Sequence, residues 1–266
     1  MNKEDKRYLE ILKAFEELIV QVDDDTDAFH IVEVLSEIRA KHLFSIVADN
    51  MMLTYEYAIN IVKDNIDKHK DEITDNRALS LISAVENLID FAVYQEYTMM
   101  TKMPSELEFT EDEDSNDTMD EFNKFNLIYA NVENSTVKHS ALIAYLFANM
   151  SDNTLLTYLT QNDEKVRYSH QLLNGLTYPK SDFPSDLIPP IDYNCRCFIV
   201  DTGVPIDIHS KKKNKHNETV NPIFSESLAK GGRIFNDKHP YFNIDNKKHI
   251  DQLSSIIKKI KDKWLK

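Results

Sequence analysis

The sequence predicts an α+β protein: a mostly α-helical N-terminal half, a small α+β C-terminal domain with a short sheet, and a terminal basic helix. Apolar residues recur at helical spacing through the first hundred residues, and strand-like runs appear only after Asn153. The chain has only four glycines and eight prolines among its 266 residues. So few turn-forming residues argue against an all-β architecture with many tight turns.

The N-terminal half is expected to form a succession of helices. Segment 7–22 carries an apolar stripe, and the acidic patch 23–27 ends it and offers caps for the next helix. The stripe resumes over 28–69, with a break expected at Asp49–Asn50, and again over 75–100, which begins with a capping residue. Aromatic and methionine residues in these helices are expected to be core.

Charge and composition divide the rest of the chain. Residues 104–121 hold nine acidic residues and no basic one, which predicts an acidic linker. The helical pattern returns over 119–150. The last segment, 246–266, has an apolar stripe flanked by lysines, made of Ile250, Leu253, Ile256, Ile257, Ile260 and Trp264. We therefore expect a helical region at 1–103, the linker, a domain at 122–245 and a basic amphipathic C-terminal helix.

The net charge of −14 is unevenly distributed. Residues 209–266 contain fourteen Lys and Arg against six Asp and Glu, so the remainder is strongly acidic. An acidic body repels nucleic acid, whereas a basic segment can approach phosphates. The alternative for the C-terminal helix is packing on its own domain.

Compartment and membrane signals are few. No apolar run approaches the roughly 20 residues that cross a bilayer, so no membrane-spanning segment is expected. The N-terminal sequence MNKEDKRYLEIL lacks the features of a secretory signal. Two cysteines do not make a disulfide framework, which favours a reducing compartment such as a bacterial cytoplasm.

The most informative part of the sequence lies between residues 154 and 200. A short Thr- and Leu-rich strand is followed by DEKVRYSHQLLNG (163–175), a loop, and IPPIDYNCRCFIV (188–200). The positions that make up this pattern are Tyr158, Thr160, Asp163, Arg167, His170, Leu173, Gly175, Pro189, Pro190, Asn194, Cys195, Arg196 and Cys197.

This order resembles the C-terminal domain of the phage Mu F-like minor head proteins, also called phage head morphogenesis proteins. The resemblance covers about 130–245, including the Asn-Pro and His-Pro-Tyr of segment 221–242. Relatives often carry His-Pro where this chain has Asp192 and Tyr193, so one imidazole of the family motif is absent.

The resemblance implies a minor structural component of a tailed-phage head and no enzyme. It would act in head morphogenesis, inside the capsid near the portal, with portal and capsid proteins as partners. A role in DNA packaging or ejection, with DNA contacted through the basic C-terminal segment, is a further hypothesis. The protein would be made in the host bacterial cytoplasm and end in the virion. The alternative is a zinc-binding or hydrolytic effector packaged in the virion.

The two cysteines allow two interpretations. On an extended segment Cys195 and Cys197 point to the same face, and so small a ring strains a disulfide between them. With His170 and His239 they would form a zinc site, for which Asp163 or Asp192 would be weaker oxygen ligands.

In the other interpretation both cysteines are small buried residues. Arg196 then pairs with Asp163 or Asp192, while Arg167 and His170 hydrogen-bond the loop and fix it to the following strand. A Cys–His pair can also act as a nucleophile, but the sequence shows no Gly-rich phosphate loop, G-x-S-x-G or H-E-x-x-H motif. The sequence therefore favours a structural motif without catalytic residues, with zinc as the only candidate cofactor.

Overall fold

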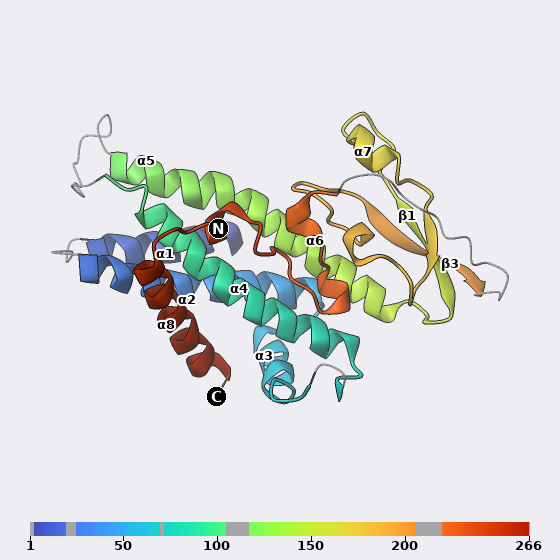
Figure 1. Ribbon diagram of the computed structural model, residues 1–266, viewed down its shortest axis with the longest axis horizontal. Helices are drawn as coiled ribbons and strands as arrows, with labels where there is room; N and C mark the ends of the chain where they lie inside the picture. The colour runs from blue at the N-terminus through green and yellow to red at the C-terminus, as the bar shows by residue number, and fades with distance from the viewer. Residues whose placement is uncertain (1–2, 20–24, 70–71, 105–116, 206–219, 266) are drawn as a thin grey trace. The chain divides into compact units, whose positions relative to one another are not determined.

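The computed structural model describes residues 3–19, 25–69, 72–104, 117–205 and 220–265 (Figure 1). These residues form long helices and one three-stranded antiparallel sheet, which confirms the α+β class. The longer helices are α1 (Lys3–Ile19), α2 (Asp25–Asn50), α3 (Tyr55–Lys63), α4 (Asn76–Met100), α5 (Asp117–Asn123), α6 (Ala130–Asn149) and α8 (Lys247–Leu265). Among them, none is both long and apolar enough to cross a bilayer.

The chain divides into two compact units, each built from separate stretches of sequence. The helical unit comprises Met1–Ser45, Val85–Asn134 and His239–Lys266. The sheet unit comprises Ile46–Ala84 and Ser135–Lys238. The domain boundaries expected from the sequence stay a prediction, and most of the expected acidic linker, 105–116, lies outside the described residues.

The core of the helical unit is aromatic and also contains charged side chains. Phe15 stacks on Phe122 with ring centroids 4.5 Å apart, as the apolar stripe of the first helix predicts. Beside this core, Arg39 donates a hydrogen bond to Glu96 at 2.7 Å, and both side chains are buried. A six-residue π-helix, η2 (Lys124–Tyr129), follows α5 and brings the buried amide of Asn126 to the same arginine.

Helix α8 packs within the helical unit through the stripe expected from the sequence. Its buried residues are Leu253, Ile256, Ile260 and Trp264. Three flanking lysines form ion pairs with acidic residues of α2 and α4, namely Lys259–Glu33, Lys261–Asp90 and Lys263–Glu37. Of the two alternatives for this helix, the structure therefore shows packing on its own unit.

The sheet unit is built around β1 (Thr154–Leu159), the central strand of the order β2-β1-β3. It pairs antiparallel with β2 (Thr177–Pro179) and with β3 (Phe198–Pro205) (Figure 1). Alternate residues of β1 point inward, so Leu156 and Tyr158 are fully buried. The strand expected at 154–161 is thus present, and the apolar run after the cysteines is β3.

Short 3-10 helices connect the sheet to the rest of its unit. They are η3 (Ser185–Leu187), η4 (Pro222–Phe224) and η5 (Leu228–Lys230). The N-terminal part of α4 holds η5 and its C-cap by two hydrogen bonds. Ser80 donates to the carbonyl of Leu228 at 2.9 Å, and Ser83 donates to that of Gly231 at 2.8 Å. These contacts join residues 148 positions apart within the sheet unit.

Candidate metal centre

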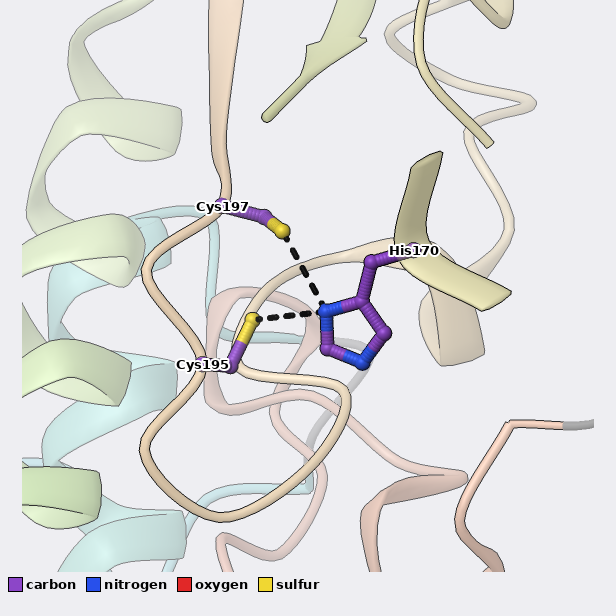
Figure 2. A group of neighbouring side chains, drawn as sticks. All are labelled: His170, Cys195 and Cys197. Atoms are coloured by element: carbon purple, nitrogen blue, oxygen red, sulfur yellow. Dashed lines mark hydrogen bonds between the residues drawn. The ribbon is translucent and has the colours of Figure 1, made fainter. Parts of the chain in front are cut away.

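Three side chains of the predicted motif meet in the sheet unit: His170, Cys195 and Cys197. The Nδ1 atom of His170 lies 3.4 Å from the sulfur of Cys197 and 3.9 Å from that of Cys195 (Figure 2). One donor atom from each residue lies within 4.8 Å of the others, and all three side chains are buried. Both cysteines are free thiols. Three donor atoms this close together could bind one metal ion.

The cysteines reach the site from the segment that enters β3. Asn194 adopts a left-handed conformation, with φ of 54°, which asparagine tolerates better than most residues. The chain is then held by a hydrogen bond from the Cys195 amide to the Asp192 carbonyl at 3.2 Å. The two sulfurs face the same imidazole nitrogen, as expected for alternate residues of an extended segment (Figure 2).

His170 comes from α7 (Tyr168–Gln171), a single helical turn after β1. The turn ends near Leu173, which is buried, and Gly175 then reverses the chain with φ of +86°. The Gly175 amide donates to the Tyr158 carbonyl at 2.8 Å. Glycine suits this position because a positive φ strains residues that carry a Cβ.

Arg196 and Asp163 close the motif on its exposed side. The two guanidinium nitrogens of Arg196 lie 2.8 and 2.6 Å from the two carboxylate oxygens of Asp163. Hydrogen bonding by Arg196 holds the pKa of Asp163 below its usual value. Of the two carboxylates named from the sequence, the partner of Arg196 is therefore Asp163.

Arg167 holds the loop that precedes the cysteines. It donates to the Tyr193 carbonyl at 2.8 Å and lies 3.5 Å from the Asp192 carboxylate. Asn221 also donates to Asp192, at 2.8 Å, and the Tyr193 ring packs edge-on against Phe224 at 5.0 Å. Asp192 and Tyr193 thus fix the loop by an ion pair and an aromatic contact.

The remaining predicted positions lie outside this cluster of donor atoms. Pro189 and Pro190 are buried in the loop and joined by a cis peptide bond. His239 belongs to the helical unit, where its ring lies 5.0 Å from Phe91 and accepts a hydrogen bond from the Tyr241 amide. Burial lowers the pKa of His239 to about 4, so its imidazole is neutral near pH 7.

The protonation of the thiols is asymmetric. Hydrogen bonding by Cys197, supported by His170 and by the backbone amides of Ile191 and Cys197, lowers the pKa of Cys195 to about 4 despite its burial. The pKa of Cys197 is raised by its bond to Cys195 and by burial. The Cys195 thiolate therefore forms readily, and hydrogen-bond donors surround its sulfur.

Three residues near the site have no role in the sequence-based interpretation. Tyr158, named there only as a motif position, places its buried hydroxyl beside the thiols, and burial raises its pKa. His139 of α6 donates to the Cys197 carbonyl at 2.8 Å. Asn221 donates a hydrogen bond to the Asp192 carboxylate. Helical spacing does not reveal contacts of this kind, whereas the Asn-Pro at 221 is a visible part of the family-like pattern.

The comparisons agree with the motif. Residues 100–200 match the model of the family described as Phage Mu protein F like protein. The match includes Asp163, Arg167, His170 and both cysteines, and it confirms the resemblance predicted from their order. The chain therefore carries a region similar to the phage Mu F-like proteins, a family associated with phage head morphogenesis.

An uncharacterized protein of Methanocaldococcus jannaschii, MJ0329, is 45% identical over 47 residues. The aligned segment is 18% of this chain and 8% of that relative, so the match describes a short segment and carries no function. No solved structure matches the chain.

Proposed function

We propose that this protein is a minor structural component of a tailed-phage head, placed inside the capsid near the portal and acting in head morphogenesis. The observation that carries the proposal is the family match over 100–200, which includes a motif whose residues are joined by contacts in the structure. Portal and capsid proteins are the partners that such a position requires.

The contacts within the motif favour a structural role over hydrolysis. A catalytic arginine or carboxylate must be available to substrate. Here Asp163 is held by Arg196, and Arg167 is held by Asp192 and the Tyr193 carbonyl. These interactions connect the loop to the strand that follows it, which supports a role in shaping the domain.

DNA packaging or ejection is the finer part of the proposal. The C-terminal segment 209–266 is basic in sequence, but Lys259, Lys261 and Lys263 are paired with acidic residues of the helical unit. A direct test is the salt dependence of DNA binding by the full chain. Binding that weakens steeply with salt supports phosphate contact, and absence of binding removes DNA from the proposal.

The main test is deletion of the gene in the phage or prophage that encodes the chain. We expect the yield of infectious heads to fall at normal levels of portal and capsid protein, and complementation by the wild-type gene to restore it. An unchanged yield of infectious heads after deletion would contradict the proposal.

A further inference from the structure

The distances in the His170–Cys195–Cys197 cluster match those of a zinc site. Zinc lies about 2.3 Å from a thiolate sulfur and about 2.0–2.1 Å from an imidazole nitrogen, so tetrahedral geometry separates sulfur and nitrogen by about 3.6 Å. The two observed separations, 3.4 and 3.9 Å, lie on either side of that value. A single ion between the three atoms would need only small side-chain movements.

Once binding has released the Cys197 proton, the cluster would also supply the charge that a buried zinc ion requires. Two thiolates and a neutral imidazole give a set of soft and borderline donors that suits zinc, and the divalent ion balances the two negative charges. A site with no net charge avoids most of the cost of burying an ion.

Zinc bound by these three side chains would need a fourth ligand to complete its tetrahedral coordination. The Tyr158 hydroxyl is fully buried and, within the described part of the chain, makes no hydrogen bond of normal geometry. Leaving a buried polar group without a partner destabilises the folded state. The hydroxyl lies beside the Cys197 sulfur, and a water molecule on the metal would give it a hydrogen-bond partner of normal geometry.

We propose that His170 Nδ1 and the sulfurs of Cys195 and Cys197 bind one structural zinc ion, with a water molecule that hydrogen-bonds Tyr158 as fourth ligand. His239 takes no part. The ion joins the α7 turn to the segment before β3 and so closes the irregular loop between them. His139 does not bind the ion. It donates a hydrogen bond to the Cys197 carbonyl and so holds the backbone of this ligand in position.

The first experiment measures metal in the full chain, purified under reducing conditions from zinc-supplied cells. We expect about one zinc per chain. After replacement by cobalt(II), we expect the intense visible bands of a tetrahedral ion and a thiolate charge-transfer band in the near ultraviolet. Less than a tenth of an equivalent of zinc together with no such cobalt spectrum would overturn the proposal, as would a stoichiometric metal other than zinc.

Variants then identify the ligands. Cys195→Ser, Cys197→Ser and His170→Ala should each lose stoichiometric zinc, whereas His239→Asn, the matched histidine control, should retain it. Tyr158→Phe should bind zinc about 10- to 100-fold more weakly, because it removes only the partner of the bound water. Full zinc in the double variant Cys195→Ser, Cys197→Ser, or loss of zinc in a folded His239→Asn variant, would contradict this ligand set. If the ligand variants fail to fold, the wild-type metal content and cobalt spectrum still decide the question.

Discussion

Arg196 and Asp163, 33 residues apart, form a two-pronged ion pair with nitrogen–oxygen distances of 2.8 and 2.6 Å. The pair joins the start of the motif to its end, on the opposite side of the chain from the cysteine sulfurs. It thereby connects β1 and α7 to the segment that enters β3.

We expect Arg196→Ala to lower the urea midpoint of unfolding by a small, measurable amount, because the pair is partly exposed but bidentate and long-range. Arg77→Ala is the matched control, since Arg77 pairs with Asp75, two residues away, at 3.6 Å. Equal midpoints for the two variants would show that the Arg196 pair does not tether the motif.

Gly231→Ala should destabilise the protein by more than Gly175→Ala. Both glycines have positive φ, +70° and +86°, so both substitutions incur about 1–2 kcal/mol of backbone strain. Only at position 231 would the new Cβ lie 2.7 Å from Leu79, which adds about 1–3 kcal/mol of overpacking. Chemical denaturation of the two variants measures the difference. Equal losses would contradict the close packing of η5 on α4.

Lys180→Ala should lower the free energy of unfolding by about 1–3 kcal/mol. The buried Lys180 ammonium donates to the Met150 carbonyl at 2.6 Å at the end of α6, and lies 5.3 Å from the Phe147 ring centroid. The substitution removes the charged donor from that carbonyl. Lys165→Ala, at an exposed lysine of the same unit, is the control and should change little. A loss no larger than that of the control would contradict this role.

Glu133→Gln should stabilise the protein above pH 7 but not near pH 4.5. Burial raises the pKa of Glu133 to about 7, against hydrogen bonds from Tyr241 and Gln95 that favour the carboxylate. Between about 4.5 and 7 the folded state therefore holds a proton that the unfolded state has released, so stability falls as pH rises through this window.

Glutamine does not titrate, so Glu133→Gln should remove this loss of stability with rising pH. The loss is on the order of a few kcal/mol. Thermal unfolding from pH 4.5 to 8 measures it, with the exposed Glu16→Gln as control. A wild-type and a Glu133→Gln curve that stay parallel over this range would show that Glu133 is already ionised in the folded state.

Much of the fold could be predicted from periodicity. The stripes of α1 and α8, the break at Asp49–Asn50 where α2 ends, and the strand β1 follow from apolar spacing and capping. The π-helix η2 could not, because six residues of wider turn do not alter the apolar pattern enough to be distinguished from an α-helix.

Part of the candidate site could also be predicted from the sequence. The order of Asp163, His170 and the two cysteines indicated residues that meet, since they belong to one family-like motif. The sequence did not indicate that His239 falls in the helical unit, because a histidine in an irregular segment carries no periodicity. Nor did it distinguish Asp163 from Asp192 as the partner of Arg196, since that choice depends on how the loop turns between them.

The proposal that the protein is an internal component of the head is tested most directly by protease treatment of purified heads. Quantitative mass spectrometry should detect this chain in the heads, protected from added protease until the heads are opened. Absence of the chain from purified heads, or its digestion while the heads are intact, would contradict the account.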